Sequence, residues 1–183
     1  MRALLAVALL LASASTAQAN LRACQELYRA APKTLGGTPM TGTANYEKEK
    51  RGSGYTVQFV RNDNDVASVF FYDRRQNQFS EKELATELSV AASNIFRLRA
   101  SGRNVTDSDV FFDRPEKPTR GLFGLAFIHV VFDGRTRQHD FISLGSVNGC
   151  LVKLIYSTNG PRNRANRKFT RTLNDLLAYL EKS

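Results

Sequence analysis

Alternating apolar and polar residues predict β-strands over much of the second half of the chain. The clearest runs are Gly124 to Phe132, Phe141 to Val147 and Cys150 to Tyr156. They are separated by Asp133-Gly134 and Asn148-Gly149, pairs that tolerate the positive φ angles of tight hairpin turns. The pattern therefore predicts a three-stranded antiparallel meander.

Three further strands are expected upstream. Tyr55 to Arg61 alternates, Val66 to Tyr72 is apolar on both faces, and the polar residues 62–65 between them are typical of a hairpin turn. Asn104 to Phe112 is the sixth expected strand. Residues 33–44 are rich in Gly, Thr and Pro, so they are interpreted as a connecting loop.

Three amphipathic helices are predicted from apolar residues at helical spacing. The first is short, carries Leu21, Cys24, Tyr28 and Ala31, and ends at Pro32. The second begins at Ser80, which is spaced from Glu83 as in a capping box; its apolar stripe is Leu84, Leu88, Ala91, Ile95 and Leu98. The third has Asn163 or Asn166 as its N-cap candidate, and its stripe is Phe169, Leu173, Leu176, Leu177 and Leu180.

Several predicted strands are apolar on both faces, and such strands must be covered on both sides. The three helices can supply that cover. We therefore expect an α+β fold, an α/β/α sandwich around a mainly antiparallel sheet of about six strands, with residues 20–183 as a single domain.

The first 19 residues have the three parts of a secretory signal peptide: Arg2, the apolar run from Ala3 to Ala12, and the cleavage motif Ala17-Gln18-Ala19. Polar residues interrupt the apolar run after Ala12, so it is too short to span a membrane. We expect cleavage after Ala19, no transmembrane segment, and a periplasmic or secreted product.

The two cysteines, Cys24 and Cys150, both follow the expected cleavage point. Because an oxidising compartment favours pairing, they are predicted to form a disulfide that closes most of the domain into one loop. A redox-active thiol would need a C-x-x-C motif or a neighbouring base, and the sequence has neither.

Positive charge exceeds negative charge: 26 Lys and Arg residues stand against 17 Asp and Glu, a formal charge of +9. The excess is concentrated in a segment without acids that enters the last helix. Its cations are Arg162, Arg164, Arg167, Lys168 and Arg171. Helix N-termini favour acids, so cations there invite an anionic partner; an ordinary solvated surface is the alternative.

The sequence carries no recognisable catalytic or cofactor motif. Gly52-Ser53-Gly54 and Gly145-Ser146 are not nucleophile elbows, and no cofactor is expected. His129 and His139 can face each other across the hairpin near Asp133 and Asp140. They could be metal ligands, but the interpretation we favour is a pair of ordinary strand histidines. Residues 62–65 lack the Gly and distal Glu of a calcium loop.

The order of elements resembles the PsbP-like family of exported α/β/α proteins. The resemblance covers residues from about 45 to 182 and includes the helix opening Ser80-Glu81-Lys82-Glu83-Leu84 and the segment from Asn148 to Ser157. It implies a mostly non-enzymatic accessory role. No functional residue of the family matches position by position, and the lipid-anchor Cys of its lipoprotein members is missing.

These observations favour an exported binding or accessory protein without catalytic activity. Its expected partner is an anionic envelope component or an acidic protein; export argues against nucleic acid. The alternative is a small envelope hydrolase whose site is not visible as a motif.

Overall fold

The computed structural model describes residues 21–62, 65–76, 78–113 and 122–182. The expected signal peptide and its cleavage point after Ala19 lie outside these residues. So does the tip of the polar turn between the first two predicted strands, at Asp63 and Asn64.

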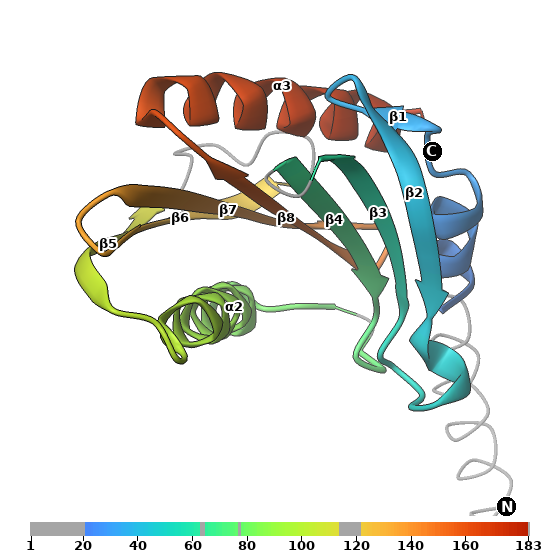
Figure 1. Cartoon of the computed structure of the whole chain (residues 1–183). Helices are drawn as coiled ribbons and strands as arrows, with labels where there is room; N and C mark the ends of the chain where they lie inside the picture. Colours follow the sequence, from blue (N-terminus) through green and yellow to red (C-terminus); the bar gives the residue numbers. More distant parts are fainter. Residues whose placement is uncertain (1–20, 63–64, 77, 114–121, 183) are drawn as a thin grey trace, which may run out of the picture.

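One curled sheet of eight strands forms the centre of the fold, in the order β1-β2-β3-β4-β8-β7-β6-β5 (Figure 1). All neighbouring strands in this order pair antiparallel. The strands are β1 (Thr34–Leu35), β2 (Thr38–Asn45), β3 (Tyr55–Asn62), β4 (Asp65–Tyr72), β5 (Val105–Asp113), β6 (Leu122–Phe132), β7 (Thr136–Val147) and β8 (Cys150–Asn159).

The prediction of six strands was wrong because the segment 33–44 is not a connecting loop. It forms β1 and β2, and β2 pairs with β3 along most of its length. Gly36 and Gly37, with φ angles of 61° and 74°, make the tight turn between β1 and β2. The glycines that suggested a loop are therefore the turn of a hairpin.

The hairpins themselves are confirmed. β3 pairs with β4, and β6, β7 and β8 form the expected meander. Asp133, Gly134, Asn148 and Gly149 all have positive φ, between 50° and 78°, as tight hairpin turns require. β7 begins at Thr136, five residues earlier than the apolar pattern indicated.

Within the described ranges three helices accompany the sheet: residues 21–29, α2 (Glu81–Ala100) and α3 (Arg162–Leu180), together with a short 3-10 turn η1 (Tyr46–Lys48). Ser80 and Glu83 form the predicted capping box. Two details of the prediction were wrong. Leu98 is 65% exposed and is not on the buried face of α2, whose last turn instead contacts the sheet through Arg99. α3 begins after Pro161 with no side-chain cap rather than at Asn163 or Asn166.

The helices lie on both faces of the sheet, α3 above and α2 below in the view of Figure 1. Phe169, Leu173 and Leu176 of α3 pack with Val57, Phe59 and other residues of the upper core. Leu84, Leu88 and Ala91 of α2 pack against β6 and β7 in a second core. The sheet is thus buried between two apolar layers.

The disulfide between Cys24 and Cys150 joins the N-terminal helical residues to the start of β8. The S–S distance is 2.11 Å, and both cysteines are fully buried in the upper core. The bond connects residues 126 positions apart. It therefore fixes the first helix to the centre of the sheet.

α2 covers the lower face of β6 and β7, and the strands beyond it are less covered. Phe70 of β4 and Ile155 of β8 are partly buried on that face. No helix in the described ranges is long and apolar enough to cross a membrane.

Candidate functional site

The five cations predicted to bind an anion lie within the first three turns of α3, not in a loop before it. At about 100° per residue, Arg164, Arg167, Lys168 and Arg171 fall within about 100° of one another around the helix. The buried residues Ala165, Phe169, Thr172 and Leu176 are centred about 120° around the helix from this group. The helix thus separates a basic face from its packing face.

Arg162 is not part of this basic face. It is the first residue of α3, and its guanidinium carbon lies 5.2 Å from the ring centroid of Phe111 on β5. This distance is typical of a cation–π contact. The contact ties the start of α3 to the edge strand.

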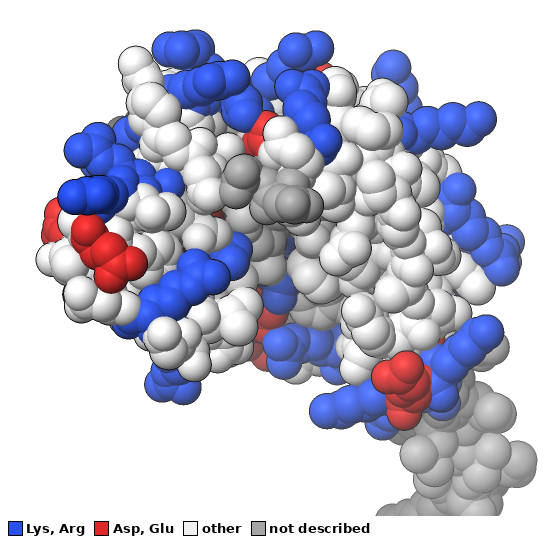
Figure 2. Space-filling view, viewed as in Figure 1, with Lys and Arg blue, Asp and Glu red and all other residues white. Residues whose placement is uncertain are grey.

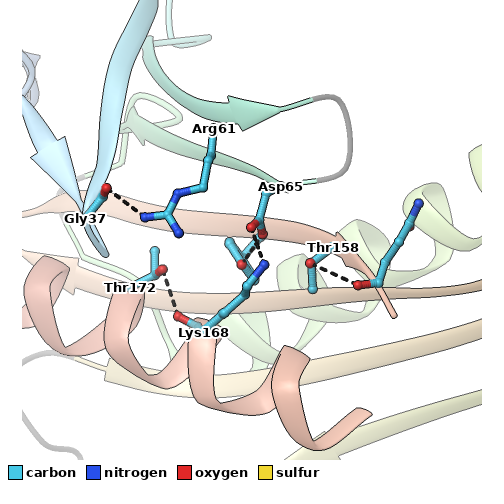
Figure 3. A network of polar contacts seen from close by, with 8 residues as sticks. Gly37, Arg61, Asp65, Thr158, Lys168 and Thr172 are labelled. Atoms are coloured by element: carbon cyan, nitrogen blue, oxygen red, sulfur yellow. Dashed lines mark hydrogen bonds and ion pairs between the residues drawn. The ribbon is translucent and has the colours of Figure 1, made fainter. Parts of the chain in front are cut away.

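Lys168 is engaged within the protein (Figure 3). Its ammonium group donates to the carboxylate of Asp65, which also accepts from the hydroxyl of Tyr156. Asp65 is 4% exposed at the start of β4. The network joins α3 to β4 and β8, so Lys168 holds the fold together and is less available to a partner.

The same contacts shift the pKa values of Asp65 and Tyr156. Burial raises the pKa of Asp65, but the hydrogen bonds from Lys168 and Tyr156 outweigh it, and the pKa is lowered overall. Burial and the neighbouring Asp65 raise the pKa of the Tyr156 hydroxyl. Asp65 is therefore ionised and Tyr156 neutral near pH 7.

A second group of cations surrounds the β1–β2 turn. Arg61 at the end of β3 donates to the carbonyl of Gly37 over 2.9 Å. A Cβ atom on Gly37 would lie 3.3 Å from Nη2 of Arg171 and 3.4 Å from Nη2 of Arg61. The two guanidinium groups therefore converge on this turn, which Asp175 fastens to α3 by accepting the Gly36 N–H at 2.9 Å.

The outer face of α3 carries little compensating charge. Its first turn contains no acid, and the side chains of Arg164 and Arg167 form no ion pair or hydrogen bond with other described residues. Figure 2 shows Lys and Arg side chains along the top of the view, where α3 lies, with few acids between them. An anion there would meet exposed and unneutralised guanidinium groups.

His129 and His139 do meet across the β6–β7 hairpin. Their Nδ1 atoms are 3.2 Å apart, and their rings stack at 4.6 Å between centroids. Nε2 of His139 lies 2.9 Å from the carbonyl oxygen of Gly160. Burial is the main cause that lowers the pKa of His139.

The histidines do not recruit Asp140 as a third ligand. Asp140 follows His139 in β7 and therefore points to the opposite face of the sheet. There it accepts from Arg99 at 2.8 and 3.0 Å and from the hydroxyl of Ser157 at 2.5 Å. Within the described parts of the chain, no three His, Cys, Asp or Glu residues are grouped so that they could hold a metal ion.

No protein-family model matches the sequence, and no curated protein sequence matches it. A structural comparison gives a match. The fold is similar to that of a cyanobacterial PsbP. The solution structure of this protein (CyanoP) from Synechocystis sp. PCC 6803 matches with a TM-score of 0.46 and 13% identity, over 73% of this chain and 79% of that chain. The similarity concerns the chain path, so function is argued below from the residues.

Proposed function

We propose that the chain is an exported, non-catalytic binding or accessory protein of the cell envelope that engages an anionic partner through one face of α3. We call this face the α3 basic surface and define it as Arg61, Arg164, Arg167 and Arg171. Arg162 and Lys168 are left out because Phe111 and Asp65 already engage them.

One observation carries the proposal: exposed guanidinium groups gather on α3 and the adjoining turn, and none of them forms an ion pair with another described residue. Arg61 and Arg171 converge beside Gly37, and Arg164 and Arg167 extend the surface toward the start of the helix. Like charges held close together repel one another, and an anion bound between them offsets this repulsion. The positive end of the α3 dipole adds to this field.

The shape of the surface favours an extended partner. From Arg164 to Arg171 the helix rises about 10 Å, so the guanidinium groups form a ridge that can touch several negative charges at once. Phosphate-bearing lipid headgroups at an envelope membrane present such an array, and each Lys or Arg near an anionic membrane contributes about 1 kcal/mol. An acidic protein is the other candidate partner.

Two observations support the proposed export: the leader pattern of residues 1–19 and the disulfide, since such bonds persist in oxidising compartments. An intact-mass measurement on exported protein is expected to give a chain that begins at Asn20. The non-catalytic assignment is favoured because the two histidines hydrogen-bond to each other and to Gly160 rather than to a serine that they could activate.

The test is co-sedimentation with vesicles of phosphatidylglycerol, with neutral phosphatidylcholine vesicles as reference. The triple variant R164Q/R167Q/R171Q is expected to lose about tenfold or more in affinity for the anionic vesicles, because three charge contacts are removed. Raising the salt concentration should weaken binding of the unaltered protein, since salt screens exposed charges.

The matched control is K48Q/K82Q/R97Q, which removes the same charge from exposed positions on η1 and α2 and should bind as the unaltered protein does. Equal loss in both triple variants would mean that net charge alone drives binding, and the proposal would fail. Binding to polyglutamate but not to the vesicles would assign the surface to an acidic protein.

A further inference from the structure

A cavity of about 670 Å³ opens on the lower face of the sheet, far from the α3 basic surface. It is bounded by the loop at residues 49–54, the turn at residues 73–76, the ends of β4 and β8, and α2. Phe70 and Tyr72 contribute aromatic rings to its lining. In Figure 2 the surface is hollowed between α2 and the strands to its right.

Positive side chains dominate this cavity. Five cations line it against the single carboxylate of Glu87; they are Lys50, Arg51, Arg74, Arg75 and Lys153. They come from three places in the chain: the loop before β3, the turn after β4, and β8. The fold therefore gathers charges that the sequence keeps apart.

The carboxylate is already engaged by its neighbours. Glu87 is 9% exposed and accepts from Tyr72 at 2.7 Å and from Lys153 at 3.2 Å, while Arg74 lies 2.5 Å away. Burial raises the pKa of Glu87, but these three contacts outweigh burial and lower the pKa overall. The carboxyl group is therefore ionised near neutral pH. Glu87 thus orients Arg74 and Lys153 at the inner wall.

The remaining cations have no such partner. The side chains of Lys50, Arg51 and Arg75 form no ion pair or hydrogen bond with other described residues. All three are exposed at the mouth of the cavity. Their charge is free to bind something that enters.

The loop that carries Lys50 and Arg51 is held in place by one carboxylate. Glu47 accepts from the N–H groups of Gly52 and Gly54 at 2.5 to 3.1 Å. Both glycines have positive φ, and a Cβ on Gly54 would lie 1.9 Å from the carbonyl oxygen of Phe71. The loop therefore packs closely on the end of β4.

The turn that carries Arg74 and Arg75 is similarly fixed. Both arginines have positive φ, 46° and 59°, a conformation that costs free energy in residues with a Cβ. Buried Asp73 supports it by accepting the N–H of Arg75 at 3.0 Å. Strain of this kind persists where the surrounding structure compels it, and here it aims two adjacent guanidinium groups at one cavity.

We infer that this cavity is a binding site for a small oxyanion that carries two or more negative charges on phosphate or carboxylate groups. Its volume falls within the range of about 300–1,000 Å³ that small-molecule sites occupy. Guanidinium groups bind such oxyanions through paired hydrogen bonds. Arg51 and Arg75 are the residues that contact the ligand first, and Lys153 completes the inner wall.

This site does not depend on the α3 basic surface, and its ligand is of a different kind. The ridge on α3 suits an extended partner, whereas the cavity encloses a molecule of limited size. The two proposals can therefore fail separately.

The experiment is isothermal titration calorimetry with inorganic pyrophosphate and with citrate, at constant ionic strength near pH 7.5. Pyrophosphate represents the phosphate chemistry and citrate the carboxylate chemistry. The double variant R51Q/R75Q should bind the preferred probe about tenfold more weakly or worse, because two charge-assisted contacts are lost. The matched double variant R97Q/R135Q, which removes two exposed cations outside both proposed sites, should bind within about twofold of the unaltered protein.

Equal melting temperatures for both variants would show that the fold is intact, and K50Q, on the loop rather than the strained turn, provides a second test if R51Q/R75Q is unstable. Binding of one probe and not the other supports the inference and assigns its chemistry. Absence of binding for both probes at millimolar concentration, or equal loss in the two double variants, would overturn it.

Discussion

The contact between His129 and His139 determines which of their nitrogens carry protons. The carbonyl of Gly160 can only accept, so Nε2 of His139 must donate to it. Nδ1 of a neutral His139 is then an acceptor, and Nδ1 of His129 donates to it over 3.2 Å. A second proton on His139 would break this arrangement.

We therefore expect the free energy of unfolding to fall as the pH drops below about 6.5, the ordinary pKa of histidine. Burial, His129 and Arg162 lower the pKa of His139, while Gly160 and Asp140 raise it less. In this range the unfolded chain binds more protons than the folded chain. The contribution of His139 to stability is therefore complete above pH 6.5 and is lost as the pH falls toward the lower pKa that His139 has in the folded state. Urea unfolding at several pH values between 5 and 8 measures this loss.

The variant His139→Gln is the control, and its stability should change little across that pH range. The carboxylates of Asp65 and Glu87 also have lowered pKa values. Their contribution to stability is lost only below about pH 4.5, so it does not overlap with the loss expected from His139. The same slope in the variant as in the unaltered protein would contradict a role for His139.

At the scale of elements, α3 carries cations of two kinds, and they should respond differently to substitution. Lys168→Gln removes the charge that faces buried Asp65, and we expect it to lower the free energy of unfolding by about 1–3 kcal/mol. Arg167→Gln, on the same exposed face, should change it by less than about 0.5 kcal/mol. Urea denaturation of both variants gives the comparison.

Equal effects of these two substitutions would show that the network of Lys168, Asp65 and Tyr156 does not stabilise the fold. Asp65→Asn provides a further check from the other side of the ion pair. It should lower stability about as much as Lys168→Gln and, combined with it, add less than the sum of the two.

Strands with clear apolar alternation could be predicted from the sequence, whereas β1 and β2 could not. β2 lies near the end of the sheet, where alternate side chains such as Thr41 and Thr43 are exposed. It therefore needs no apolar residue at every second position. Its glycines and threonines suggested a loop because composition does not reveal which neighbour a segment pairs with.

The basic segment of α3 could be recognised in the sequence because it contains no acid. Which of its cations contact other parts of the fold, and which remain free, could not be predicted. Lys168 and its partner Asp65 are 103 positions apart, and the contact of Arg162 with Phe111 crosses from helix to sheet. Four of the five cavity cations occur as two short pairs, Lys50-Arg51 and Arg74-Arg75, and neither pair alone indicates a site. Their convergence depends on the β3–β4 hairpin, which brings both to one end of the sheet.

For the molecule as a whole, the disulfide should account for a large share of stability. It closes a loop between residues 126 positions apart, and in the chain-entropy model such a loop contributes about 4 to 5 kcal/mol, often less in practice. We expect the variant Cys24→Ser/Cys150→Ser to unfold at a markedly lower urea concentration. The oxidised protein treated with a reductant should unfold at the same concentration as the variant.

A reductant that leaves the urea midpoint of the unaltered protein unchanged would contradict this expectation. The double variant treated with reductant controls for effects of the reagent itself, since it has no cysteine left to reduce.

The layered arrangement could be predicted directly from the sequence: strands apolar on both faces required helices on both sides, and α2 and α3 provide them.

The neighbouring positions of β4 and β8 determine the order in which the sheet can assemble. β1 to β4 and β5 to β8 each form a meander of locally connected hairpins; among the described strands, the β4–β8 pairing alone joins segments distant in the chain. Closing that seam costs the entropy of a loop containing α2 and three strands, so it should limit the rate of folding. Cys24 and Cys150 belong to opposite halves, and a chain that unfolds with its disulfide intact begins refolding with the two halves already tethered.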